Sequence, residues 1–111
     1  MADKGLINVR GMNCRPELDE KFNKWYNEVH IPMLIKNKAM KRASRYKRIG
    51  DDESYPKYLA VYEFESKEGF NAYNSGPELV EALEDLEATW KEEDTESVWR
   101  VQYEVIQTWE K

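Results

Sequence analysis

The clearest strand signal in the chain is KYLAVYEFE, residues 57–65. Its apolar residues are almost continuous from Tyr58 to Phe64, as in strands that are covered on both faces. A stretch with turn composition, GDDESYP at residues 50–56, precedes it. Ser66 follows it, and the hydroxyl of a serine suits the N-cap of a helix. This part of the chain therefore predicts a central strand that leads directly into a helix.

The residues before this strand predict a strand, a helix and a second strand. Residues 6–12 favour a strand, and Pro16 fits the first turn of a helix because its missing N–H would be unpaired there. Apolar residues then recur every three or four positions, as on one face of a helix: Leu18, Phe22, Trp25, Val29 and Met33. Pro32 lies inside this pattern, so we expect the helix to end or kink near His30. Residues 39–49, which are basic, predict the second strand.

The residues after the central strand predict a helix and a last strand. The helix carries Phe70 and Tyr73, is interrupted at residues 75–77, and resumes with an apolar face. In the last strand, residues 97–109, apolar side chains alternate with polar ones, so the two kinds lie on opposite faces: Trp99, Val101, Tyr103 and Val105 against Arg100, Gln102 and Glu104. The resulting order is that of a ferredoxin-like βαββαβ fold of the α+β class. It predicts a four-stranded antiparallel sheet with both helices on one face.

The length of 111 residues suits a single domain, residues 1–111. The face of the sheet without helices would carry too many large apolar groups to remain in water. Two copies packed sheet against sheet would cover that face in both. We therefore expect a homodimer of the dimeric α+β barrel type.

Composition argues against several classes of partner. The chain has 22 acidic and 17 basic residues, a net charge of −5, whereas nucleic-acid binding relies on a basic surface. The basic run at residues 36–48 is either a solvated loop and edge strand or a phosphate-binding patch. No apolar stretch approaches the length of a membrane span, and the N-terminus does not resemble a signal peptide. With a single cysteine as well, the sequence predicts a cytoplasmic protein without nucleic-acid or membrane partners.

His30 is the only histidine, and its ordinary pKa near neutral pH makes it the first candidate for proton transfer. Tyr26 precedes it by four residues, so the two rings can meet on one side of a helix. In the alternative interpretation, His30 only bonds a backbone carbonyl and stabilises the kink before Pro32. Both interpretations are open at the level of the sequence.

Two segments, FNKWYNEVHIP at residues 22–32 and YLAVYEFES at residues 58–66, resemble the EthD-like family of the dimeric α+β barrel superfamily. The shared feature is an aromatic helix that ends in a His-x-Pro step, here His30 to Pro32. The resemblance implies a cofactor-free enzyme that acts on a small polyketide, lactone or aromatic molecule. Isomerisation, cyclisation, dehydration or cofactor-free oxygenation would fit, with His30 as acid or base. A non-catalytic dimer that binds small ligands or serves in stress is the alternative.

The expected site has two catalytic residues, His30 and Tyr26. The expected substrate-binding residues are Trp25, Tyr46, Tyr62, Arg45 and Arg100. If the polar strand faces meet across the dimer, their charges either form interface ion pairs or line a wet cavity for an anionic or phenolic ligand. No metal or cofactor is expected: one histidine and one cysteine do not form a zinc site, and the segment that carries the haem ligand in related enzymes has no histidine.

Overall fold

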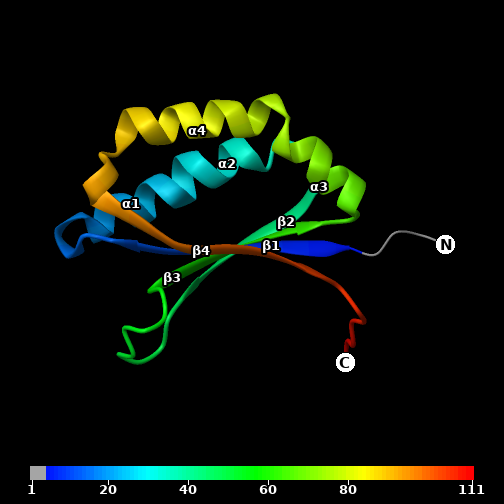
Figure 1. The fold of residues 1–111 in the computed structure, drawn as a ribbon, viewed down its shortest axis with the longest axis horizontal. Helices are drawn as coiled ribbons and strands as arrows, with labels where there is room; N and C mark the ends of the chain where they lie inside the picture. The colour runs from blue at the N-terminus through cyan, green and yellow to red at the C-terminus, as the bar shows by residue number, and fades with distance from the viewer. Residues whose placement is uncertain (1–4) are drawn as a thin grey trace.

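The computed structural model describes residues 5–111, which form one sheet with helices on one side (Figure 1). The strands are β1 (Leu6–Cys14), β2 (Met40–Lys47), β3 (Tyr58–Phe64) and β4 (Thr95–Glu104). The α-helices are α1 (Asp19–Trp25), α2 (Ile31–Leu34), α3 (Lys67–Asn74) and α4 (Pro77–Thr89). Shorter turns of helix are the 3₁₀ turns η1 (Pro16–Leu18) and η3 (Glu92–Asp94) and the π-helical turn η2 (Tyr26–His30).

The four strands form an antiparallel sheet in the order β2-β3-β1-β4. The prediction of a ferredoxin-like α+β fold is thus confirmed. The register places Asn8 between Tyr62 of β3 and Gln102 of β4, and Arg10 between Ala60 and Arg100. Because direct partners in a ladder point to the same face, these side chains share one side of the sheet.

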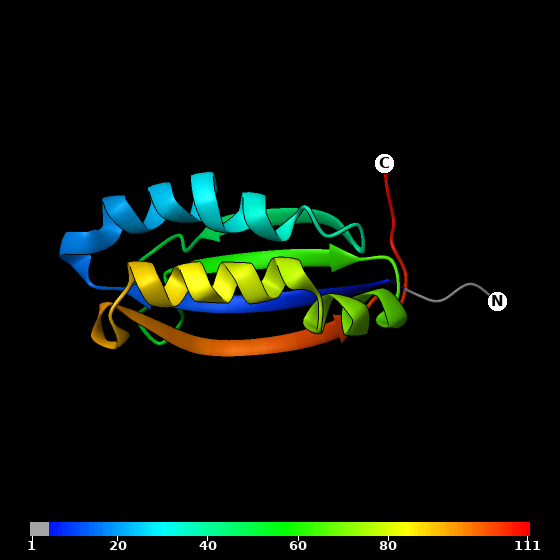
Figure 2. The same ribbon diagram turned by 90° about the horizontal axis from the view of Figure 1, so that it is seen from above.

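All helices lie on that same side, which is called the inner face here. The rod formed by α1, η2 and α2 covers β2 and β3, and α4 runs beside it over β1 (Figure 2). β4 lies at the edge of the sheet, beside α4 (Figure 2). The core between helices and sheet is largely aromatic: Phe22 packs against Tyr26, Tyr58 and Trp90.

None of the helices within residues 5–111 is long and apolar enough to cross a membrane.

The helical rod does not end near His30 but continues through Pro32 to Leu34, which corrects the expectation that the helix stops there. Instead, the chain inserts the π-helical turn η2, in which the N–H of Ile31 donates to the carbonyl of Tyr26, five residues earlier. An extra residue in a turn rotates the later part of the helix by about 100° relative to a regular α-helix. His30 is therefore buried at 4% exposure, whereas Val29, which the apolar pattern placed in the core, is 37% exposed.

The last strand ends at Glu104 and not at residue 109 as predicted. Glu104 pairs with Leu6, the first residue of β1, so the ladder has no partner strand beyond it. One further backbone bond runs from the N–H of Val105 to the carbonyl of Gly5. The remaining C-terminal residues extend toward the side of the sheet that lacks helices (Figure 1). Ile106 and Trp109 are highly exposed there.

Candidate functional site

A cavity of about 490 Å³ lies between the inner face of the sheet and the helices. This volume is in the range typical of small-molecule sites. The polar residues that line it are Asn8, Arg10, Tyr26, His30, Tyr62, Tyr73, Asn74, Thr95, Arg100 and Gln102. The apolar ones are Met12, Phe22, Trp25, Leu34, Phe70, Leu79, Leu83 and Leu86.

The cavity has a buried end and an open side. His30, Tyr26 and Tyr62, at one end, are each no more than 4% exposed. Arg100 and Gln102 of β4 and Leu83 of α4 are exposed. The edge strand β4 and helix α4 therefore form the mouth, and a ligand that enters between them meets His30 inside.

His30 is held between two aromatic rings. Its imidazole stacks on Trp25, with ring centroids 4.5 Å apart and an angle of 22° between the planes. Tyr26 meets it edge-on at 4.9 Å. The Nδ1 atom is buried and has no hydrogen-bond partner among residues 5–111. At Nδ1, therefore, His30 does not form the bond to a backbone carbonyl that the alternative, purely structural interpretation requires.

Burial lowers the pKa of His30 from 6.5 to about 4, and the positive charge of Arg10 adds to this effect. Asp85 acts in the opposite direction and only in part offsets it. The imidazole is consequently neutral at pH 7. A neutral imidazole has one nitrogen that accepts a proton and one that donates a hydrogen bond, so it can serve in either role.

Three tyrosines line the cavity together with the histidine: Tyr26, Tyr62 and Tyr73. The hydroxyl of Tyr62 lies 3.5 Å from that of Tyr26. Burial raises the pKa of Tyr62 well above its ordinary value of 10, and burial also raises the pKa of Tyr73 to about 12. Tyr62 and Tyr73 therefore remain protonated and can donate hydrogen bonds to an oxygen of a ligand.

The sheet contributes a polar floor from β1 and β4. The side-chain amide of Gln102 donates to Oδ1 of Asn8 at 2.9 Å. Arg10 lies directly opposite Arg100 in the ladder. The contacts of the Arg10 guanidinium are weak, the Ser97 hydroxyl at 3.4 Å and the Met12 sulfur at 3.9 Å, and its Nε is buried without a partner.

Asp85 of α4 fixes the ring on which His30 stacks. Its Oδ2 accepts a hydrogen bond of 2.8 Å from Nε1 of Trp25. Because Trp25 contacts His30 face to face, this bond also restricts the position of the imidazole. No sequence pattern indicates this role, since Asp85 is one of many acidic residues in a polar helix.

Five of the seven predicted site residues meet at the cavity: Trp25, Tyr26, His30, Tyr62 and Arg100. The other two, Arg45 and Tyr46, do not line this cavity and instead line a separate, more open pocket near the start of α1. Tyr46 pairs with Leu59 on the opposite face of the sheet and is 55% exposed. Arg45 is on the inner face, but its guanidinium lies over the ring of Tyr26 at 4.6 Å and its Nη1 donates to Asn27.

The sequence left open whether the polar strand faces meet across a dimer. In the structure, Arg10, Arg45 and Arg100 point toward the helices of their own chain. Arg10 and Arg100 are thereby cavity residues.

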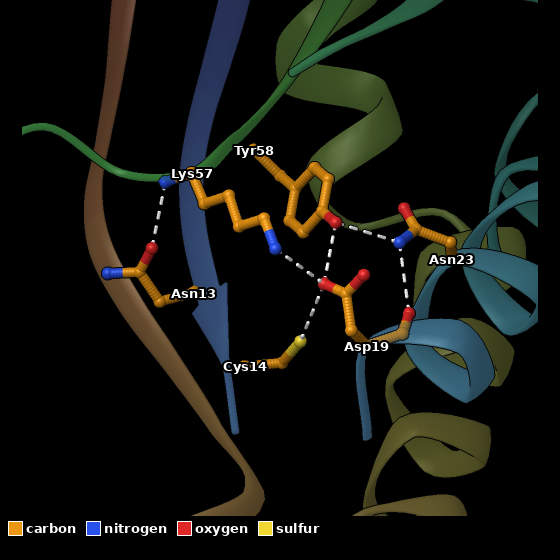
Figure 3. A network of polar contacts seen from close by, with 6 residues as sticks. All are labelled: Asn13, Cys14, Asp19, Asn23, Lys57 and Tyr58. Atoms are coloured by element: carbon orange, nitrogen blue, oxygen red, sulfur yellow. Dashed lines mark hydrogen bonds and ion pairs between the residues drawn. The ribbon is translucent and has the colours of Figure 1, made fainter. Parts of the chain in front are cut away.

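A second polar cluster lies at the start of α1 (Figure 3). The Asp19 carboxylate accepts hydrogen bonds from Tyr58 at 2.6 Å and from Lys57 at 3.2 Å, and it also contacts the Cys14 sulfur at 3.8 Å. The bond from Tyr58 lowers the pKa of Asp19, while burial raises the pKa of the Cys14 thiol, the opposite of what a reactive thiol needs. Asn23 donates to Tyr58, so the cluster ties the first helix to β1 and β3.

Residues 5–111 contain no group of three or more His, Cys, Asp or Glu side chains that could hold a metal ion.

A family model described as a domain of unknown function, DUF4286, matches residues 6–93, which run from the start of β1 into η3 and do not include the edge strand β4. The chain belongs to the DUF4286 family. No curated protein matches it in sequence.

Solved structures similar to this DUF4286 chain share its fold at low sequence identity. A hydroxynitrile lyase from Passiflora edulis has a TM-score of 0.71 and 13% identity, with 99% of this chain and 100% of that chain covered. An EthD family protein from Bacillus halodurans has a TM-score of 0.69 and 12% identity, with 93% and 99% covered. SnoaB, a cofactor-independent oxygenase from Streptomyces nogalater, has a TM-score of 0.60 and 14% identity, with 97% of each chain covered. The chain thus shares its fold with an EthD family protein.

Proposed function

We propose that the cavity is the active site of an enzyme that transfers protons on a small oxygenated molecule, without a cofactor, and that His30 is its acid or base. The observation that carries this proposal is the buried, unpartnered Nδ1 of His30 at the inner end of a cavity of substrate size. A buried polar atom without a partner is uncommon and calls for an explanation. A substrate group that bonds to it supplies one.

The surrounding side chains suit chemistry next to a carbonyl group. His30 removes a proton from carbon or oxygen, and the negative charge that develops on the carbonyl oxygen is stabilised by hydroxyl groups of Tyr26 or Tyr62. The same proton returns to another atom of the substrate in an isomerisation or cyclisation. Trp25 holds the imidazole in place, and the leucines of α4 exclude water from the apolar part of the substrate.

Proton exchange next to carbonyl groups tests this proposal with generic probe compounds. The protein is incubated in D₂O with a panel of aromatic ketones and 1,3-diketones, and deuterium incorporation is followed by NMR. We expect catalysed exchange for some members of the panel. Replacement His30→Gln should reduce its rate by about 10²-fold or more, the usual contribution of a general base.

The matched control is Tyr46→Phe, which removes a hydroxyl group from a predicted site residue that lies on the other face of the sheet. It should leave the exchange rate unchanged. Full exchange activity in a folded His30→Gln variant would contradict the proposal, as would the absence of catalysed exchange across the panel.

The low pKa of His30 favours a second candidate function, binding without catalysis, because a group with a pKa of about 4 is a weak base. In that case the cavity would take up the panel compounds and exchange none of their protons. Isothermal titration of the same compounds separates the two candidates: binding with no exchange supports the second.

The partner that completes the molecule is, in this proposal, a second copy of the chain. The face of the sheet opposite the helices, called the outer face here, presents apolar side chains of three strands: Ile7, Val9, Leu59, Val61, Trp99, Val101 and Tyr103. Trp99 and Tyr103 are exposed. A homodimer formed through these faces removes them from water and leaves the cavity of each chain open.

A further inference from the structure

The residues that line the cavity include two arginines and no aspartate or glutamate. The chain as a whole is acidic, with 22 acidic residues against 17 basic ones, so this excess of positive charge is local. Neither Arg10 nor Arg100 forms an ion pair with any residue between 5 and 111. The cavity therefore carries positive charge that the protein itself does not neutralise.

The placement of the two arginines is unfavourable for the unliganded protein. They are direct partners across β1 and β4, and like charges in that position destabilise a sheet. Arg10 also has a buried Nε without a hydrogen-bond partner. A group that accepts from both guanidinium ions relieves the repulsion and satisfies this donor at once.

The wall opposite this polar floor is apolar. Leu79, Leu83 and Leu86 follow one side of α4 and face the cavity. Leu83 is exposed at the mouth, although a leucine is normally buried when a helix packs on a sheet. A ligand that satisfies both walls has an apolar body against α4 and a charged group against β1 and β4.

From this division we infer that the ligand is an apolar carboxylate, whose carboxylate group binds between Arg10 and Arg100 while its body lies against the leucines of α4. This inference rests on the proposed function, because it assigns the substrate class of the same cavity. It also gives the arginines a second effect. Burial, with a smaller contribution from the charge of Arg10, lowers the pKa of His30, so a bound anion that offsets the Arg10 charge strengthens His30 as a base.

Two probes of the same shape test the charge preference: 2-naphthoate and its neutral amide, 2-naphthamide. Their dissociation constants are measured by isothermal titration at pH 7.5 and low salt. We expect native protein to bind the carboxylate at least about tenfold more tightly than the amide. The variant Arg10→Gln/Arg100→Gln should lose this preference, and its affinity for the amide should remain within about twofold.

Two control variants keep the result interpretable. Lys36→Gln/Lys38→Gln removes the same total charge from exposed positions outside the cavity and should retain the preference. Arg100→Gln alone changes only an exposed residue, so it remains informative if the double variant does not fold, and it should weaken carboxylate binding by about tenfold.

The outcomes also separate this inference from the proposed function. Equal binding of both probes would overturn the carboxylate inference and leave a small-molecule site in place. Failure of both probes to bind would overturn the inference and count against the cavity as a binding site. Tighter binding of the carboxylate that persists in both arginine variants would place the anion elsewhere on the protein and overturn the inference as well.

Discussion

Each face of the sheet departs in one respect from the usual pattern, although the inner face also carries the apolar core of the chain. The inner face, which the helices cover, carries Asn8, Arg10, Arg100 and Gln102. The outer face, which nothing in this chain covers, is apolar along its centre. In most such sheets the covered face is apolar and the other is polar. The polar side chains inside support the proposed ligand, and the apolar outer face supports the proposed homodimer.

The inner face itself is divided into a packed part and a hollow part. Beneath α1, aromatic rings fill the space and Phe22 is only 1% exposed. Toward β4 the helices no longer cover the sheet, and the cavity opens there. Stability and ligand binding thus depend on neighbouring regions of one layer, and Phe22 lies at their boundary because it also lines the cavity.

The largest expected effect comes from the packed part. Phe22→Ala removes a ring that contacts Tyr26, Tyr58 and Trp90, and it should lower the free energy of unfolding by about 3–5 kcal/mol. Ile49→Ala, at a residue that is 99% exposed, should change it by less than about 0.5 kcal/mol. Urea denaturation measures both. Similar losses in the two variants would show that the inner face is not packed as described.

A smaller loss of stability is expected when the pH is lowered, and it comes from His30 in the hollow part of the inner face. The pKa of His30 is lowered from 6.5 to about 4 in the folded protein, so the unfolded chain binds a proton first as the pH falls. The contribution of neutral His30 to the free energy of unfolding is fully present above pH 6.5 and is lost as the pH falls toward 4. It amounts to about 3 kcal/mol in total. The variant His30→Phe should lack this component. Parallel stability curves for the two proteins between pH 7 and pH 4 would contradict the buried neutral histidine.

The smallest of the three effects concerns the outer face. Val61 lies at its centre, paired with Val9 of β1, and Val61→Glu would place a charge inside the proposed dimer interface. We expect the dissociation constant of the dimer to rise at least about 30-fold, which corresponds to roughly 2 kcal/mol. Sedimentation velocity measures the change, with Glu53→Gln in the exposed loop before β3 as control. A native protein that sediments as a monomer at all concentrations would refute the dimer.

The order of the elements and the two faces of the last strand were predictable because alternation and helical periodicity are local properties of a sequence. The location of the cavity was not. Alternation shows that Arg100 and Gln102 share a face, but it does not show on which side the helices pack. The same limit explains Tyr46 and Arg45: one is on the other face, and one is on the inner face behind Tyr26.

His30 illustrates both what a motif provides and what it omits. The aromatic helix and its His-x-Pro step identified the central residue of the candidate site. The apolar repeat nevertheless placed Val29 in the core and His30 at its margin, and the structure reverses the two. A repeat of three and four residues assumes a regular helix, so it cannot reveal a single additional residue in one turn.

That additional residue changes which residues of the helical rod face the core. The buried positions are Phe22 and Trp25 in α1, Tyr26 and His30 within η2, and Leu34 in α2, whereas Val29 is exposed. We expect that removal of Asn27 or Glu28 from η2 would restore a regular helix, return Val29 to the interior and turn His30 out toward water. Among related chains, the presence of this π-helical turn is therefore a better guide to a shared site than the presence of the histidine. In a regular helix, a histidine at the same position would point away from the cavity.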